Sequence, residues 1–159
     1  TDGDCIPRAD WIASIKRAFG EGAEFLAGRI GFRSDDCRLS AFEHATFSLI
    51  AGLMAQVAPF LPHNRDGRYL APYVMAGGGN LAITAPLYLR SGGFPRIRLE
   101  EDNDDRGLTN RVRLLTARVV RDRRIVVDQS ARRVKQYGVR NSILWYMNRR
   151  YRPDNVDVR

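Results

Sequence analysis

The sequence predicts an α/β domain in which a mixed sheet is flanked by helices. Two stretches have helical character: an amphipathic one over 11–19 and a longer, apolar one over 41–57. Short runs rich in β-branched residues, over 117–120 and 124–127, predict strands near the end of the chain. Loops that feed helices carry the ligand-binding groups of many α/β enzymes, so the loops are where we expect functional residues.

The length of the chain limits it to one domain, and its excess of basic residues lies in the last quarter of the sequence. At 159 residues it can bury a substantial core but is too short for two ordinary domains. Residues 1–116 carry 14 basic and 14 acidic side chains, whereas 117–159 carry 12 basic and 4 acidic. This asymmetry indicates a phosphate-bearing ligand, an anionic membrane surface or nucleic acid, unless the arginines form a solvated face. Cys5 and Cys37 match neither a zinc site nor a secreted disulfide framework, so we expect a cytoplasmic protein.

The chain opens with two aspartates, Asp2 and Asp4, separated by one glycine. Carboxylates at this spacing can bind one hard cation, Mg²⁺ or Mn²⁺, which takes oxygen ligands and keeps further bonds for substrate phosphates. Asp-Gly-Asp is also a common turn, and the spacing alone leaves both interpretations open. Pro7 predicts the first residue of the helix that follows, and Gly20 predicts its end.

The stretch 24–30 predicts the first longer strand. Its Gly28, together with Gly31, indicates a bend or a close approach of another segment. The next acidic pair, Asp35-Asp36, lies in a polar loop without any further site residue, and we interpret it as a solvated turn.

The helix over 41–57 has a clear start signal. Ser40 and Glu43 form a capping box, and the apolar residues that follow continue to the proline-containing stretch after Val57. The apolar run approaches the length of a membrane span, but Gly52 and Gln56 interrupt it. We therefore predict a helix that is buried or packed on the surface of the domain.

Three consecutive glycines, 77–79, precede Asn80 and the short strand 81–83. Glycines allow a ligand to approach the backbone, and the Asn80 amide offers a donor and an acceptor, although such a run can also be a flexible turn. Thr84 then begins a helix that ends at Gly92-Gly93.

Five carboxylates lie among the six residues Glu100 to Asp105. Their mutual repulsion favours a nearby cation or raised pKa values. Leu108, Val112 and Leu115 give the next stretch a helical face, so the carboxylates lie at a helix N-terminus, where the helix dipole favours negative charge. The alternative is that these carboxylates only cap the helix and keep the loop solvated.

The last quarter begins with two strands, 117–120 and 124–127, separated by the charged turn Arg121-Asp122-Arg123. Arg132 and Arg133 follow, and paired arginines suit a diphosphate. The tail, residues 136–159, is basic and aromatic, and it is compatible either with an interfacial helix on an anionic membrane or with packing on its own domain.

Four of these stretches, in this order, resemble motifs of bacterial family 2 glycosyltransferases, which have the GT-A fold. Thr1-Asp2-Gly3-Asp4, with Pro7 and Trp11, resembles their TDxD…P…W segment, and Gly78-Gly79-Asn80-Leu81-Ala82 resembles G-x-N-x-A. Gly92-Gly93-Phe94, Glu101-Asp102 and Leu108 resemble GGF…ED…L, and Ser130-Ala131-Arg132-Arg133 resembles an S-A-R-R ending. The Q-x-x-R-W motif of processive synthases is incomplete, because Arg133 stands where its tryptophan would be.

The resemblance covers most of residues 1–135 and implies that 1–135 are the C-terminal portion of a GT-A catalytic domain, with 136–159 as a tail. It implies transfer of a sugar, with inversion, from a nucleotide-diphospho-sugar donor to a hydroxyl of a glycan or lipid-linked acceptor. Asp102 would be the general base, and Asp4 with Asp2 would hold Mg²⁺ or Mn²⁺. The donor diphosphate would contact Asp2, Asp4, Arg132 and Arg133, and the sugar or acceptor would contact Gly78, Gly79, Asn80 and Glu101.

In that family a nucleotide-binding half precedes the acidic loop. The resemblance therefore implies a missing N-terminal half or a homo-oligomer formed through residues 1–30 and 75–85. It implies a cytoplasmic enzyme at the cytoplasmic face of the inner membrane, and no nucleic-acid partner is expected. Two alternatives remain compatible with the residues: a basic binding module for anionic lipid or nucleic acid, and a glycosyltransferase fragment without catalytic activity.

Overall fold

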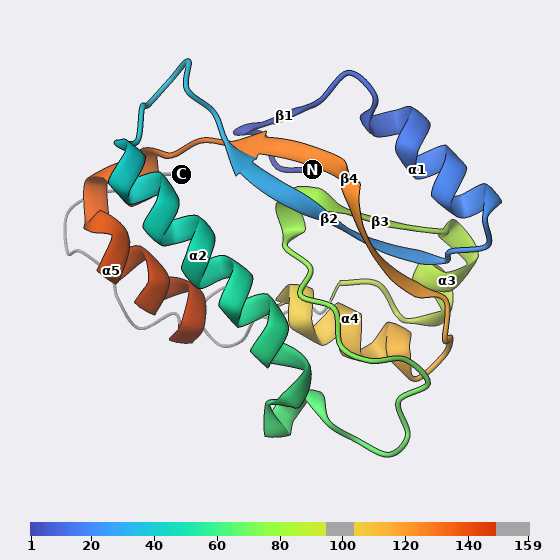
Figure 1. Ribbon diagram of the computed structural model, residues 1–159. Coiled ribbons are helices and arrows are strands. Elements are labelled where there is room, and N and C mark those ends of the chain that lie inside the picture. Colours follow the sequence, from blue (N-terminus) through green and yellow to red (C-terminus); the bar gives the residue numbers. More distant parts are fainter. Residues whose placement is uncertain (95–103, 149–159) are drawn as a thin grey trace.

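The structure is a computed structural model that describes residues 1–94 and 104–148. A mixed four-stranded sheet of order β1-β4-β2-β3 forms its centre, with helices around it (Figure 1). The strands are β1 (Cys5–Pro7), β2 (Phe25–Phe32), β3 (Leu81–Ile83) and β4 (Val119–Gln129). The central pair, β2 and β4, runs parallel, and the two short outer strands run antiparallel to their neighbours. The predicted α/β class, a mixed sheet flanked by helices, is confirmed.

The helices are α1 (Trp11–Gly20), α2 (Ala41–Val57), α3 (Ala85–Arg90), α4 (Asp104–Arg113) and α5 (Arg132–Asn148). Gly138, at φ 75°, divides α5 into two helical pieces. Within the described ranges, no helix combines the length and the apolar character that a membrane crossing requires. Figure 1 shows α2 and α5 next to each other beyond one end of the sheet.

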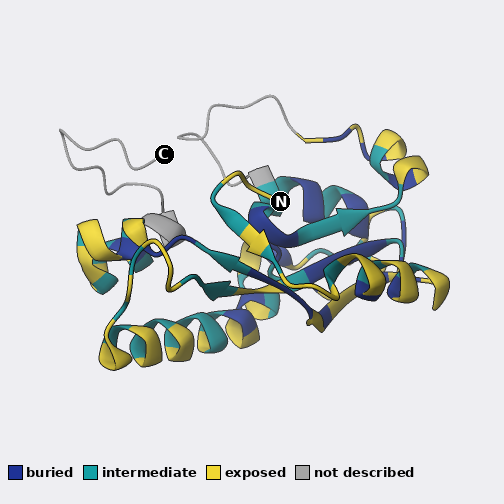
Figure 2. Cartoon of the chain, turned by 90° about the horizontal axis from the view of Figure 1, so that it is seen from above, coloured by how far each residue is buried: buried dark blue, intermediate teal, exposed yellow. Residues whose placement is uncertain are grey.

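Two apolar clusters pack on opposite faces of β2, because neighbouring side chains of a strand point to opposite sides. Phe25 and Ala27 pack with Leu87 of α3 and Val112 of α4 on one face. Leu26 packs on the other face against α1, in a cluster whose further buried members are Ala18, Ala23 and Ile125. Figure 2 shows buried stretches in the strands at the centre of the molecule, whereas α2 is exposed along its outward side. The core therefore holds the sheet, α1, α3 and α4 together.

Two sequence predictions about local structure are wrong. Pro7 does not begin a helix: it is the last residue of β1 and pairs with Val127, while α1 begins at Trp11. The stretches around 117–127 are not two strands with a turn, but one continuous strand, β4. The charged residues expected to form the turn instead form an irregularity in the pairing with β2, where Ala27 lies opposite Arg121 and Arg29 lies opposite Val126.

The irregularity is stabilised locally and accommodated by Gly28 of β2. The buried Asp122 carboxylate accepts hydrogen bonds from the backbone N–H of Arg124 (2.9 Å) and from its guanidinium (Nη2 at 2.7 Å). A Cβ placed on Gly28 would lie 2.6 Å from the Ile125 carbonyl oxygen and would also meet the Asn80 side chain. The expectation that another segment approaches closely at this glycine is confirmed.

Replacing Gly28 with alanine should therefore lower the free energy of unfolding by about 1–3 kcal/mol, because the methyl group forces β4 and Asn80 apart. The matched control is Gly52→Ala in α2, where a Cβ would have no neighbour within 4 Å. That control should raise stability by about 0.5–1 kcal/mol, since alanine loses less backbone entropy in a helix. Urea denaturation measures the free energy of unfolding of both variants. Equal changes in the two variants would contradict this explanation.

The capping box of α2 forms as predicted, and it extends to α5. The Ser40 side chain accepts from the Glu43 backbone N–H, and the Glu43 carboxylate accepts from the Ser40 N–H (2.7 Å). Lys135 of α5 also lies 3.2 Å from this carboxylate. The Ser40 hydrogen bonds, with a smaller contribution from Lys135, lower the pKa of Glu43 to about 2.

A pH dependence follows from this lowered pKa. The ionised Glu43 stabilises the fold at pH values above its unfolded-state pKa of 4.5, and the contribution is lost as the pH falls from there towards 2. Glu43→Gln should therefore be less stable than the wild-type protein at neutral pH, with the difference shrinking over that acidic window. Denaturant midpoints measured across the window test this, and a constant difference would be contrary to the expectation.

Candidate functional site

Four loops meet at one end of the sheet, where β2 and β4 end side by side with Phe32 opposite Gln129. The loop before β1 lies at this end because β1 is antiparallel to β4, and the Ser130 N–H donates to the Asp4 carbonyl (3.2 Å). The glycine turn before β3 faces the same end because β3 is antiparallel to β2. The carboxyl ends of parallel strands are where open α/β sheets bind ligands. The topology thus gathers most of the loops predicted from the sequence.

The acidic loop brings three potential ligand atoms together. Those of Asp2, Asp4 and Cys5 lie within 4.8 Å of one another. The Cys5 thiol donates to Asp4 Oδ1 (3.5 Å), and burial, together with the Asp4 charge, raises the pKa of the thiol to about 11. A protonated thiol is a poor ligand for a hard cation, whereas carboxylate oxygens are good ones. The residues present therefore fit Mg²⁺ or Mn²⁺ through Asp2 and Asp4, without Cys5.

An open cavity of about 350 Å³ lies beside the acidic loop and the glycine turn. Its lining comes from Thr1, Asp2, Gly78, Leu81, Phe94 and Asp105. A Cβ on Gly78 would lie 2.9 Å from the Asp105 carboxylate, and one on Gly79 would lie 3.4 Å from Asp2 Oδ2. The two glycines therefore let carboxylates from two distant parts of the chain approach the same backbone turn. A ligand in this cavity would contact both.

Asn80 is part of the framework of this turn. Its side chain is 1% exposed, and its amide group donates to the carbonyls of Arg29 (2.7 Å) and Ile125 (3.0 Å). Its amide oxygen accepts from the Trp11 indole N–H (2.9 Å). Asn80 thus connects β2, β4, α1 and the glycine turn. A contact of this residue with sugar stays a prediction, whereas Gly78, another residue predicted to contact sugar or acceptor, lines the cavity.

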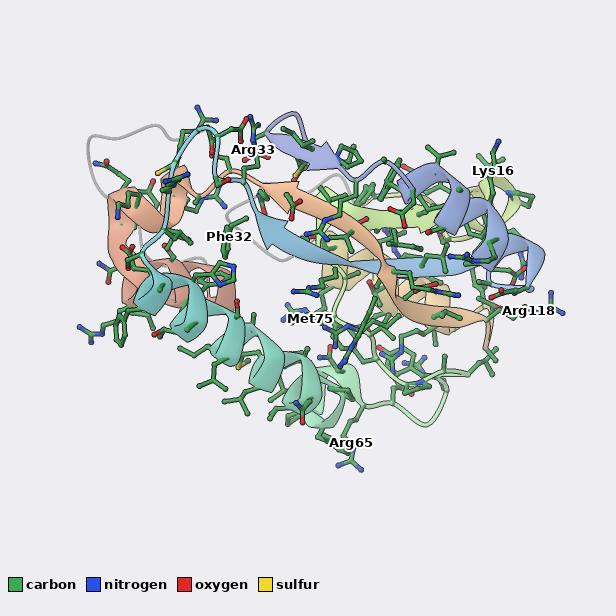
Figure 3. All side chains as sticks on the ribbon, turned by 45° about the horizontal axis from the view of Figure 1, so that its top comes forward. Lys16, Phe32, Arg33, Arg65, Met75 and Arg118 are labelled. Carbon is green, nitrogen blue, oxygen red and sulfur yellow. The ribbon has the colours of Figure 1, made fainter. Side chains whose placement is uncertain are left out.

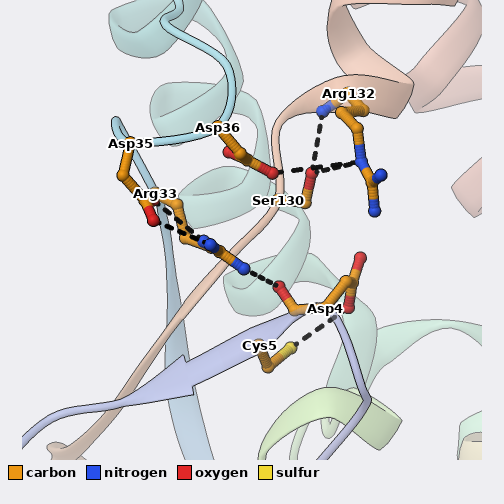
Figure 4. Close-up of polar contacts among 7 residues, drawn as sticks. All are labelled: Asp4, Cys5, Arg33, Asp35, Asp36, Ser130 and Arg132. Atoms are coloured by element: carbon orange, nitrogen blue, oxygen red, sulfur yellow. Dashed lines mark hydrogen bonds and ion pairs between the residues drawn. The ribbon is translucent and has the colours of Figure 1, made fainter.

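A smaller hollow on the other side of Asp4 holds about one water molecule and is lined by Asp4, Phe32, Gln129, Ser130, Arg132, Arg133 and Val134. Arg132 is exposed, and its Nε donates to Ser130 Oγ (3.1 Å) while lying 3.9 Å from the Asp36 carboxylate (Figure 4). The structure therefore places Asp4 next to the predicted arginine pair, although 128 positions or more separate them along the chain.

Sequence reasoning missed the loop after β2. Arg33 binds the Asp35 carboxylate with Nε and Nη2 (2.9 and 2.7 Å), which lowers the pKa of Asp35 to about 2, and its Nη1 donates to the Asp4 carbonyl (3.3 Å) (Figure 4). Asp36 pairs with Arg132, as described above. The interpretation of this segment as a solvated turn overlooked these contacts. Its position directly after a strand was the available signal.

Two predicted residues, Asp102 and Glu101, lie outside the described residues. No protein-family model, curated protein or solved structure matches the chain. The chemistry of the residues gathered at this end of the sheet is therefore the indication of function.

Proposed function

We propose that this chain transfers a sugar from a nucleotide-diphospho-sugar donor to an acceptor hydroxyl with inversion, as the C-terminal portion of a GT-A domain. The observation that carries the proposal is the gathering of three separate sequence elements around Asp4. On one side lie Asp2, the glycine turn and the open cavity, and on the other side lie Arg132 and Arg133. Carboxylates, a cation and arginines around one space suit a diphosphate whose negative charge increases during the reaction.

Each group has a distinct role in the proposal. Asp2 and Asp4 hold a divalent cation, which supplies Lewis-acid stabilisation of the departing nucleoside diphosphate. Arg132 contacts the same diphosphate and exchanges its contacts with Ser130 and Asp36 for phosphate oxygens. The sugar occupies the open cavity against Gly78, which has no side chain of its own. Asp102 removes the proton from the acceptor hydroxyl, which makes that oxygen the nucleophile.

The position of the Arg33 loop supports this assignment of roles. Arg33 fixes the carbonyl of Asp4, and Asp36 lies against Arg132, so one loop connects the metal-binding and diphosphate-binding groups. Such supporting contacts hold the site residues near the geometry that the chemistry requires. The acceptor is a glycan or lipid-linked hydroxyl in this proposal.

The experiment is thermal unfolding with Mn²⁺ and a series of nucleoside diphosphates. Ligand at one hundred times its Kd adds about 2.7 kcal/mol by mass action, which raises the Tm by about 5–10 °C. Asp4→Ala should abolish the increase that depends on Mn²⁺ and nucleotide together. Asp10→Ala is the matched control, because Asp10 is exposed, makes no side-chain cap to α1 and lies outside the site. An equal increase in Asp4→Ala and the wild-type protein would exclude the acidic loop from binding.

A further inference from the structure

The exposed face of α2 is an apolar feature that the proposed function leaves unexplained. Five side chains along it are exposed: Phe42 (78%), Leu49 (65%), Leu53 (52%), Val57 (48%) and, just after the helix, Phe60 (71%). Their spacing of about one or two helical turns places them on one side, which we call the α2 stripe. Figure 2 colours this outward side as exposed.

The opposite side of α2 already has its packing partners. Phe47 packs edge-on against Phe32 at the end of β2 (4.9 Å between ring centroids), and Glu43 binds Lys135 of α5. Figure 3 shows Phe32 between the sheet and α2. The helix is thus apolar on both sides, a pattern typical of a helix that is covered on both sides. Ala55 is the only residue of α2 that is buried, so the apolar side chains of the stripe remain exposed to solvent. A row of exposed apolar side chains indicates an interaction surface.

The charges around the stripe favour a partner that is apolar at its centre and anionic at its edges. The stripe carries no charged side chain, and the sequence that flanks it has an exposed arginine at each end, Arg38 before α2 and Arg65 after it. Neither arginine has an ion-pair partner within the described part of the chain. Arg65 points away from the molecule near the far end of α2 (Figure 3). Phenylalanines at both ends of the stripe and cations beyond them match an interface between acyl chains and anionic headgroups.

We propose that the α2 stripe binds the surface of an anionic lipid bilayer, with the helix lying in the plane of the interface. The apolar side chains enter the boundary between headgroups and acyl chains, and Arg38 and Arg65 contact lipid phosphates. The formal charge of +8 attracts the whole chain to such a surface. This membrane contact differs from the one predicted for the basic tail, and it does not depend on glycosyl transfer.

The test is co-sedimentation of the full 159-residue chain with vesicles of phosphatidylcholine alone and of phosphatidylcholine mixed with phosphatidylglycerol. The wild-type protein should bind the mixed vesicles. Leu49→Gln combined with Leu53→Gln should lower the partition coefficient by more than about tenfold, because two leucines lose their burial in lipid. Phe60→Gln, which lies outside α2, should also lower it. The matched control is Leu89→Gln in α3, which is more exposed (77%) than either leucine of the stripe and lies outside it, and this variant should bind as the wild type does.

A second pair of variants separates the charge contribution from the apolar one. Arg38→Gln and Arg65→Gln should each weaken binding to the mixed vesicles by about fivefold. Circular dichroism melting confirms that each variant is folded, and light scattering measures its mass. The proposal is overturned if the wild-type protein does not bind the mixed vesicles, or if the stripe variants bind as well as Leu89→Gln. It is also overturned if the protein is a dimer that Leu49→Gln with Leu53→Gln separates without changing vesicle binding, because a second copy then covers the stripe.

Discussion

Replacing Asp102 with asparagine is expected to lower kcat for sugar transfer by about 10²–10⁴-fold while leaving donor binding nearly unchanged. An amide of the same shape cannot accept the acceptor proton, and a general base acts in the transition state. Asp102 precedes α4 by two positions, and Asp105 in the first turn of α4 lines the same cavity as Asp2. The measurement is a steady-state transfer assay on the natural full-length protein.

Asp104→Asn and Asp105→Asn provide the controls. Both remove a charge from the same acidic stretch, so a general electrostatic effect would lower activity in all three variants. If Asp102 is the base, these two should retain far more activity than Asp102→Asn. A loss confined to Asp105→Asn would move the base to the residue that approaches Gly78.

Replacing Arg113 with alanine is expected to lower the free energy of unfolding by about 3–5 kcal/mol, because several acceptors lose their donor at once. This guanidinium is 3% exposed and donates to the carbonyls of Ala71 (2.9 Å) and Asn64 (3.1 Å) and to Asn110 Oδ1 (2.7 Å). It also lies over the Tyr69 ring, with Cζ 3.9 Å from the centroid. Removing it leaves buried carbonyls unsatisfied and removes the side-chain contact between Tyr69 and α4.

The control for this variant is Arg118→Ala, which removes an arginine that is exposed and points outward (Figure 3). Its effect should stay within about 0.5 kcal/mol. Lysine at position 113 should recover only part of the stability, because one ammonium group cannot reach all the acceptors of the planar guanidinium. Urea denaturation measures the three variants, and similar losses in Arg113→Ala and Arg118→Ala would contradict the structural role.

The sequence predicted the elements whose signals are local. The capping box of Ser40 and Glu43 set the start of α2, and the close approach expected at Gly28 was found. Asp4 and the arginine pair were singled out separately, and the structure places them together. That step needed the strand order, since β1 brings Asp4 beside Ser130 only after it pairs with the end of β4.

The failures concern contacts between distant residues. Pro7 has the sequence context of a helix start, but its pairing with Val127 makes it part of a strand. The charged residues 121–123 looked like a turn because nothing nearby in sequence shows β2 lying alongside them. The framework role of Asn80 also went unforeseen, because its partners Trp11, Arg29 and Ile125 come from three other segments. The predicted self-association through residues 1–30 and 75–85 stays a prediction.

The hydrogen bond between Trp11 and Asn80 makes the indole an optical reporter of the glycine turn. The emission of tryptophan depends on the polarity around its ring and on the partner of its N–H group. The sequence has one other tryptophan, Trp145, so Trp145→Phe leaves Trp11 as the single tryptophan. A ligand that displaces the turn at Gly78 would also disturb Asn80 and shift this emission. Entry of a molecule into the cavity can then be followed in real time, without a label and without knowing the reaction that follows.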